Sequence, residues 1–217
     1  MSWFASLRSA GPRREPALKG SAAMTAEAGP EVHRSLALPS VFAALARGHK
    51  MNVLDLGGAI GSNVQRLSEY GCRLDIEDLY ASKSAAAEDS LGSEFFTQFL
   101  APPEGTKFDL VLAWDLLNYL DRKELAHMAD RLRLFCRPGA LIFALVSIHK
   151  NIPAQPIRFR FVNQDEEKLV YDRRTTVERP GPRFAPAELN SALRGFHVDR
   201  SFLLRHGIQE YLFVRDE

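Results

Sequence analysis

The chain has 217 residues, of which 46% are hydrophobic and 25% are charged, and it carries a formal net charge of +1 and 2 cysteines. This length and composition predict a globular protein with one main domain, and the near-zero charge excludes any general attraction to nucleic acid or to anionic membranes. No apolar run approaches the roughly 20 residues that cross a bilayer, and two cysteines are too few for a disulfide framework. We therefore expect a cytoplasmic protein with no membrane partner and no nucleic-acid substrate.

The first 30 residues differ in composition from the rest of the chain. Serine, alanine, glycine and proline dominate them, and the acidic residues are only Glu15 and Glu27. An arginine-rich, acid-poor start is typical of a transit peptide; a disordered tail, or translation that begins at Met24, accounts for the same composition. We expect residues 1–30 to be a disordered tail and residues 31–217 to form the domain.

Hydrophobic spacing, with glycine and proline as stops, predicts alternating helices and strands in the first half of the domain. In chain order these are a helix over 36–46, a strand over 52–56, a helix over 62–70 and a strand over 72–77. The second helix should bury Val64, Leu67 and Ser68. A third strand should follow within residues 81–107, although no clear strand pattern is present there.

The second half of the domain continues the alternation and then becomes more polar. Its expected elements are a strand over 108–114, a helix after Asp121, a strand over 140–146, a hairpin of 157–161 with 169–171, a helix over 185–193, and strands over 196–204 and 210–214. Asp121 and Glu124 have the spacing of a helix capping box. The order of elements predicts an α/β fold, in which a doubly wound, mostly parallel sheet is closed by an antiparallel C-terminal strand pair.

A glycine-rich turn follows the first strand of this sheet, in the stretch from Val53 to Asn63. Such a turn lets the backbone approach a ligand closely at the carboxyl edge of a parallel sheet. Asp55 stands just before the glycines, where its carboxylate would repel the pyrophosphate of a dinucleotide. The turn therefore disfavours a nicotinamide-dependent oxidoreductase and favours a ligand that carries an ammonium or a sulfonium group.

Three further segments follow the glycine turn in a fixed order. They are Ile76-Glu77-Asp78, the stretch from Phe108 to Leu120, and Arg137-Pro138-Gly139. Together with the turn, they resemble the motifs of class I S-adenosylmethionine (SAM)-dependent methyltransferases, over roughly residues 36 to 146. The chain departs from the family pattern at three positions: Ala59 replaces the middle glycine of the turn, Asn118 replaces a frequent histidine, and Ala140 replaces the second glycine of the last motif.

The resemblance implies a Rossmann-like methyltransferase fold with SAM as the cofactor. The cofactor-binding residues that it implies are Asp55, Gly57, Gly58, Ala59, Gly61, Glu77, Asp78, Asp115, Leu116 and Asn118. Either Glu77 or Asp78 would accept both ribose hydroxyls, because one carboxylate suits a vicinal diol. The absence of a basic field favours methyl transfer to a small-molecule acceptor. The alternative is a binding or scaffold protein on the same fold that has lost catalysis.

The catalytic residues are less clear than the cofactor site. Methyl transfer from a sulfonium needs no protonation of the leaving group, so we expect no universal catalytic residue. Candidates for a general base are His149 and Tyr119, followed by Lys150 and His206. The other histidines show no clustering that suggests metal binding, and we expect no metal. The arginines between residues 149 and 183 form either a lid or anion-binding surface over the substrate, or a solvated hairpin.

Overall fold

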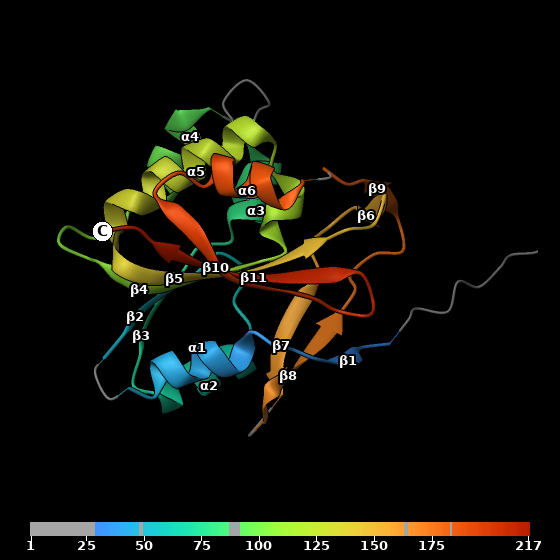
Figure 1. The fold of residues 1–217 in the computed structure, drawn as a ribbon, viewed down its shortest axis with the longest axis horizontal. Helices are drawn as coiled ribbons and strands as arrows, with labels where there is room; N and C mark the ends of the chain where they lie inside the picture. The colour runs from blue at the N-terminus through green and yellow to red at the C-terminus, as the bar shows by residue number, and fades with distance from the viewer. Residues whose placement is uncertain (1–28, 48–49, 87–91, 163–164, 183) are drawn as a thin grey trace, which may run out of the picture.

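The computed structural model describes residues 29–47, 50–86, 92–162, 165–182 and 184–217 (Figure 1). The tail expected over residues 1–30 lies outside these ranges, except for Gly29 and Pro30. None of the described helices is both long and apolar enough to cross a membrane.

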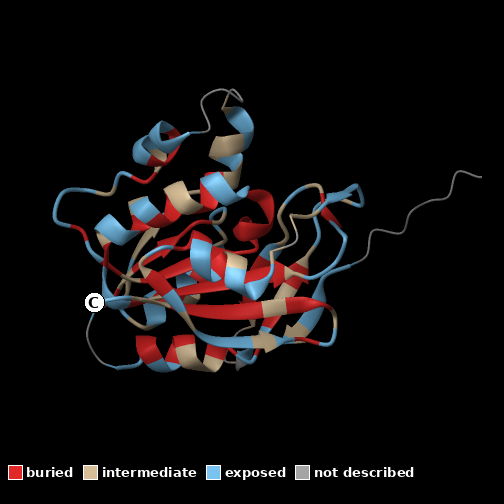
Figure 2. Ribbon diagram, turned by 45° about the horizontal axis from the view of Figure 1, so that its top comes forward, coloured by how far each residue is buried: buried red, intermediate tan, exposed pale blue. Residues whose placement is uncertain are grey.

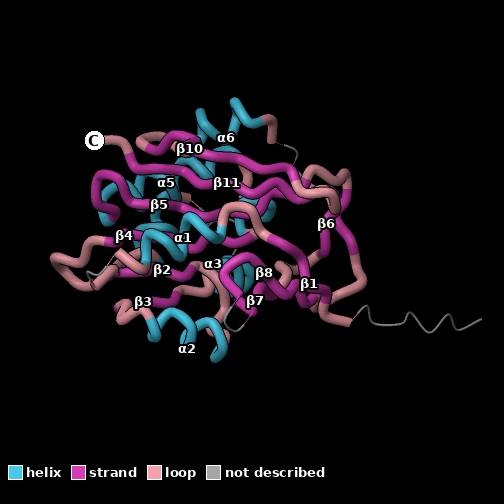
Figure 3. Tube along the Cα trace, turned by 60° about the horizontal axis from the view of Figure 1, so that its bottom comes forward, coloured by secondary structure: helices cyan, strands magenta, loops and turns pink. Residues whose placement is uncertain are grey.

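A mixed sheet of six strands forms the centre of the fold, in the order β10-β11-β5-β4-β2-β3 (Figure 3). The strands are β2 (Asn52–Asp55), β3 (Arg73–Ile76), β4 (Phe108–Trp114), β5 (Cys136–Ser147), β10 (Phe196–Leu203) and β11 (Ile208–Arg215). β3, β2, β4 and β5 are parallel, whereas β11 runs antiparallel to both β5 and β10. The predicted α/β fold, with its mostly parallel sheet and antiparallel C-terminal strands, is confirmed.

The third strand expected within residues 81–107 is absent from the described part of that segment. Two short helices lie there, α3 (Leu79–Ala85) and α4 (Ser93–Phe99). β3 is consequently the edge strand of the sheet. The aromatic pair Phe95 and Phe96 is buried in the core, so the apolar residues of this segment pack from a helix and not from a strand.

Helices cover both faces of the sheet (Figures 1 and 2). α1 (Leu38–Leu45) and α2 (Gly61–Glu69) lie on one face, and α3, α4, α5 (Arg122–Phe135) and α6 (Pro186–Ala192) lie on the other. The side chains of β4 alternate between two apolar clusters. Leu110 and Leu112 belong to the cluster that includes residues of α1, and Val111 and Ala113 belong to the cluster that includes residues of α5. A strand buried on both faces needs a continuous apolar sequence, and β4 has one.

The capping box at the start of α5 is confirmed. The Asp121 carboxylate accepts hydrogen bonds from the backbone amides of Lys123 (2.8 Å) and Glu124 (2.9 Å), and Glu124 Oε2 accepts one from the Asp121 amide at 2.7 Å. The box satisfies backbone donors that the first helical turn leaves without partners.

The prediction of which α2 residues are buried is wrong in part. Val64 and Ser68 are exposed, and Asn63 and Leu67 are the buried residues. α2 packs against a strand of a second sheet, to which the Asn63 amide is bonded: its Nδ2 donates to the Phe159 carbonyl (2.8 Å) and its Oδ1 accepts from the Phe161 amide (3.0 Å). A polar residue therefore takes the buried position, because its neighbour is backbone.

Two small antiparallel sheets, which we call the cap, lie at the carboxyl edge of the main sheet (Figure 1). They consist of β1 (Glu31–Arg34), β8 (Asp165–Asp172) and β7 (Arg158–Val162) in one sheet, and β6 (Asn151–Pro153) with β9 (Glu178–Pro180) in the other. The expected hairpin is confirmed as β7 and β8. β1, β6 and β9 were not predicted. β1 pairs with β8, far away in the sequence.

Candidate functional site

A cavity lies between the carboxyl ends of the parallel strands and the cap. Its wall is formed by Leu56, Gly57, Gly58, Ala59 and Ile60 after β2, by Asp78 and Tyr80 after β3, by Ala113, Trp114, Asp115 and Leu116 at the end of β4, and by Pro156, Ile157, Arg158, Phe159 and Arg174 of the cap. We call this space the glycine-loop cavity. Six of the residues implied by the sequence resemblance therefore share one cavity: Gly57, Gly58, Ala59, Asp78, Asp115 and Leu116.

The two acids that follow β3 point to different places. Asp78 faces the glycine-loop cavity, and a Cβ atom added to Gly58 would lie only 2.9 Å from its Oδ2. Its Oδ1 accepts a hydrogen bond from the Ala81 amide (3.0 Å) and so caps α3. Glu77 instead lines a separate hollow and accepts a hydrogen bond from Ser82 Oγ at 3.0 Å. Of the two, only Asp78 borders the cavity.

Asp55 lies beneath the glycine loop and not on the cavity wall. Its Oδ1 accepts hydrogen bonds from the Gly57 amide (2.9 Å) and from Trp114 Nε1 (2.6 Å). Burial raises the pKa of Asp55 to about 6, against the lowering effect of these two donors. Asp55 therefore holds the loop and the indole in place from below. Gly61 also lies outside the wall, at the start of α2.

Trp114 is a site residue that the sequence interpretation missed. Its backbone φ of 48° turns the chain at the end of β4, and its ring lies parallel to Phe159 of the cap at 5.7 Å between centroids. A tryptophan at the end of an apolar strand looks like an ordinary core residue. Only the Asp55 carboxylate that receives its N–H reveals that it joins the glycine loop to the cap.

A second cavity lies next to the first and is closed mainly by the cap. We call it the cap cavity. Asp115 and Ile157 line both cavities. The Asp115 side chain is buried, with 4% of its surface exposed, and its Oδ2 accepts a hydrogen bond from the Ile157 amide at 2.9 Å. Burial raises the pKa of Asp115 to about 7, because the charged form loses its hydration.

Three histidines meet at the cap cavity, namely His33 and two of the candidates for a general base, His149 and His206. The rings of His33 and His206 are stacked with centroids 4.0 Å apart, and His149 Nε2 lies 2.9 Å from the His206 carbonyl. The pairing of β1 with β8 brings His33 there, and the sequence carries no local signal of that pairing. Burial, and then the neighbouring His33, lower the pKa of His206. No group of histidine, cysteine and acidic residues within the described ranges is arranged to hold a metal ion.

Asn118 and Tyr119 also line the cap cavity, but the protein itself uses their polar atoms. Asn118 Nδ2 donates to the carbonyls of Asp115 and Leu145 (3.0 Å each), and its Oδ1 accepts from the Ser147 amide (2.9 Å). The Tyr119 hydroxyl donates to the Pro153 carbonyl at 3.0 Å, and burial raises its pKa. These contacts fix the carboxyl end of β5 and the start of the cap.

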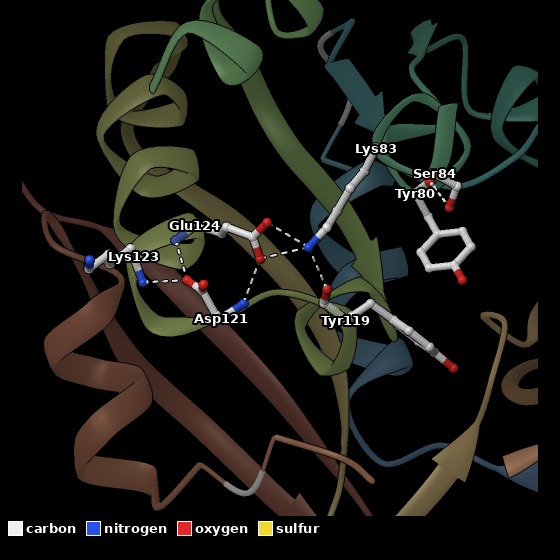
Figure 4. A network of polar contacts seen from close by, with 7 residues as sticks. All are labelled: Tyr80, Lys83, Ser84, Tyr119, Asp121, Lys123 and Glu124. Carbon is white, nitrogen blue, oxygen red and sulfur yellow. Dashed lines mark hydrogen bonds and ion pairs between the residues drawn. The ribbon is translucent and has the colours of Figure 1, made fainter. Parts of the chain in front are cut away.

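A buried ion pair holds α3 at the edge of the site (Figure 4). Lys83 Nζ lies 2.6 Å from Glu124 Oε1 and donates to the Tyr119 carbonyl at 3.0 Å. Because Glu124 is also the capping-box residue of α5, one carboxylate joins α3 to α5. The network holds the last turn of α3, whose first turn follows Asp78 and carries Tyr80 at the glycine-loop cavity.

We predict that Asp115 makes the protein less stable as the pH rises. Its folded-state pKa of about 7 lies above the ordinary value of 3.8, so its stabilising contribution is present below that ordinary value and is lost as the pH rises through 7. Between pH 5 and pH 8 the free energy of unfolding should therefore fall by about 2.8 kcal/mol, since the two pH units from 5 to 7 contribute about 1.4 kcal/mol each. Urea unfolding of wild type and Asp115→Asn at pH 5 and pH 8 measures it.

The variant should be the more stable protein at pH 8 and should lose less stability between the two pH values. Asp130→Asn, an exposed change on α5, is the control and should follow wild type. Equal pH dependence in wild type and Asp115→Asn would contradict the prediction.

Comparisons with known proteins fit this arrangement. The family model described as "Methyltransferase domain" matches residues 30–178. A comparison with curated protein sequences gave no match. Among solved structures, the chain is similar to a protein from Pyrococcus horikoshii OT3 (14% identity, 82% of this chain and 87% of that chain, TM-score 0.49) and to the N-methyltransferase NodS from Bradyrhizobium japonicum WM9 (12%, 82% and 94%, 0.45). It is also similar to 1,6-didemethyltoxoflavin-N1-methyltransferase from Burkholderia thailandensis (16%, 84% and 80%, 0.47).

Proposed function

The chain belongs to the methyltransferase domain family and is a SAM-dependent methyltransferase, and on that premise we propose that it methylates a small molecule held in the cap cavity. One observation carries the proposal: two cavities meet at Asp115 beneath the cap. Small-molecule sites are concave spaces in which a few polar groups fix the orientation of the ligand. The cap would shield both ligands from water.

The glycine-loop cavity fits SAM. The backbone at Gly58 approaches Asp78 so closely that a Cβ atom would fill the space between them, which is the kind of cradle that a nucleoside needs. We propose that Asp78 accepts the ribose hydroxyls, that Gly57, Gly58 and Ala59 contact SAM through their backbone, and that Leu116 packs against it. Asp55 would act indirectly, by holding Gly57 and Trp114.

SAM supplies a methyl group that is bound to a sulfonium sulfur. The sulfur leaves as a neutral thioether and needs no proton. The residues of this chain then have two tasks, namely to hold the acceptor in line with that methyl group and to exclude water. The hydrogen bonds of Asn118 and Tyr119 keep the floor of the cap cavity rigid for the first task. The stacked rings of Trp114 and Phe159 close the cap over the loop for the second.

Calorimetric titration with SAM, followed by a screen of small hydroxyl, amine and carboxyl acceptors with methyl-labelled SAM, tests this function. SAM should bind, and at least one acceptor should become labelled. The alternative, a binding or scaffold protein without catalysis, predicts that SAM binds and that no acceptor is labelled, either in the screen or in a cell extract. Absence of SAM binding would contradict both.

Asp78→Asn should weaken SAM binding about tenfold or more. An amide has one carbonyl acceptor, whereas the carboxylate offers two oxygens to a vicinal diol, and hydrogen bonds to charged groups are worth about 1.5–3 kcal/mol. Glu77→Gln is the matched control, because Glu77 lies outside the cavity, and its affinity should stay within about threefold of wild type. Calorimetric titration of both variants decides between the two acids. The opposite result would assign the ribose to Glu77.

A further inference from the structure

Asp115 has an unusual position for a charged group. Of the described residues that line the two cavities, it is the charged one that borders both. It is almost wholly buried, and none of the ion pairs among the described residues includes it. A buried carboxylate is costly unless it is paired or strongly hydrogen-bonded. A positively charged ligand beside Asp115 would therefore offset the free-energy cost of burying its carboxylate.

The cap cavity as a whole carries more acidic than basic groups. Its wall contains the carboxylates of Glu31, Asp115 and Glu178 and one basic side chain of fixed charge, Arg173. Burial lowers the pKa of His206, so this ring does not reverse the balance near neutral pH. A wall of this charge attracts a cation and repels an anion.

We propose, building on the function proposed above, that the methyl acceptor is a small amine whose ammonium group is bound by Asp115, and that Asp115 takes its proton. The ammonium N–H bond breaks and its proton moves to the Asp115 carboxylate, which frees the nitrogen lone pair. That lone pair forms the new N–C bond while the sulfonium S–C bond breaks and leaves its electron pair on sulfur. The protonated Asp115 then returns its proton to solvent.

The burial of Asp115 suits it to this step. A carboxyl group with a pKa of about 7 is a better proton acceptor than an ordinary carboxylate, since efficient general bases have pKa values near the working pH. The Ile157 amide fixes one of its oxygens. Asp115 follows the last residue of β4, so its position is set by the sheet and does not depend on a long loop.

Other titratable groups line the same two cavities as Asp115, and their effects on a pH profile must be distinguished from the effect of Asp115. They are Glu31 and His33 of β1, Tyr119 after β4, His149 after β5, Tyr171 and Arg173 in and after β8, Glu178 of β9, His206 before β11, and Asp78, Tyr80, Arg158 and Arg174 around the glycine-loop cavity. Because these groups are the same in wild type and in an Asp115 variant, a difference between their two pH profiles reports on Asp115.

A panel of matched amines and alcohols with the same carbon skeletons, assayed with methyl-labelled SAM, tests the inference. Amines should be labelled and their alcohol partners should not. With a labelled amine, Asp115→Asn should lower kcat/KM by about 100-fold or more, and its pH profile should lose the step near pH 7. Its affinity for S-adenosylhomocysteine should stay within about threefold of wild type. Asp130→Asn, on the exposed side of α5, is the control and should match wild type in every measurement.

Asp115→Glu keeps the carboxylate and should retain the pH step at a reduced rate, which excludes a purely structural effect. The inference is overturned if no amine is labelled, if alcohols are labelled equally well, or if Asp115→Asn keeps its activity. It is also overturned if Asp115→Asn loses affinity for S-adenosylhomocysteine by the factor that it loses in kcat/KM, because Asp115 would then hold the cofactor. Failure of the proposed function is a different result, in which wild type binds no SAM or labels no acceptor of any class.

Discussion

Replacing Gly58 by valine should weaken SAM binding at least about 100-fold, or about 2.7 kcal/mol, while the protein stays folded. Gly58 is exposed on the loop, so a side chain there meets no core. A Cβ atom at this position would lie 2.9 Å from Asp78 Oδ2. Valine would therefore displace the carboxylate that we assign to the ribose and would fill the space where backbone approaches the cofactor. Calorimetric titration with SAM and urea unfolding of the same samples measure both effects.

Gly61→Val is the matched control, three positions further along the chain. A Cβ atom at Gly61 has nothing within 4 Å, and Gly61 is outside the glycine-loop cavity, so SAM affinity should stay within about threefold of wild type. Gly57→Val is a poorer test, because a Cβ atom there lies 2.9 Å from the buried Trp114 ring and would disturb the fold. Equal loss of affinity in Gly58→Val and Gly61→Val would place the cofactor elsewhere.

Local signals in the sequence were enough to predict the six strands of the main sheet, although the additional strand expected within residues 81–107 is absent from the described part of that segment. β4 is an uninterrupted apolar run, and the capping box of Asp121 with Glu124 marks the start of α5. The glycine turn lies at the carboxyl end of β2, which is the edge of the sheet where the sequence predicts the cofactor site. Each of these features depends on residues close together in the chain, so composition and spacing reveal them.

The cap could not be predicted in the same way. β1 has four residues, and its partner β8 lies more than 130 positions further along the chain; short strands that pair over such distances leave no periodic pattern. The same pairing brings His33 to His206, a contact that the spacing of histidines in the sequence does not reveal. Asn63 was missed for a related reason, because its partner is the backbone of the cap and not another side chain.

Whether Glu77 or Asp78 faces the glycine-loop cavity depends on the residue at which β3 ends. The strand ends at Ile76, and Asp78 becomes the N-cap of α3, so Asp78 turns toward the glycine loop while Glu77 turns away. A shift of one residue reverses the direction of a side chain at the end of a strand. Sequence spacing does not define strand ends to that precision.

Trp114→Ala should lower the free energy of unfolding by about 3–5 kcal/mol, the range for removing a large buried aromatic side chain. The indole is 5% exposed and contacts Phe143, Phe159 and Phe161. Its loss would separate the cap from the sheet and remove the donor that lies 2.6 Å from the buried Asp55 carboxylate. The melting temperature should fall by roughly 10 °C, given 2–4 °C per kcal/mol for a protein of this size.

Trp114→Phe separates the two contributions of the indole. Phenylalanine keeps an aromatic ring beside Phe159 but has no N–H group for Asp55, so about 1–3 kcal/mol should be lost at pH 8. The loss should shrink at pH 5, because a protonated Asp55, whose pKa is about 6 in the folded protein, no longer carries the charge that the N–H group stabilises. Urea unfolding of both variants at the two pH values gives the four free energies of unfolding that are compared. A Trp114→Phe variant as unstable as Trp114→Ala would show that an aromatic ring by itself does not join the cap to the glycine loop. A loss independent of pH would show that the charge of Asp55 has no part in the effect.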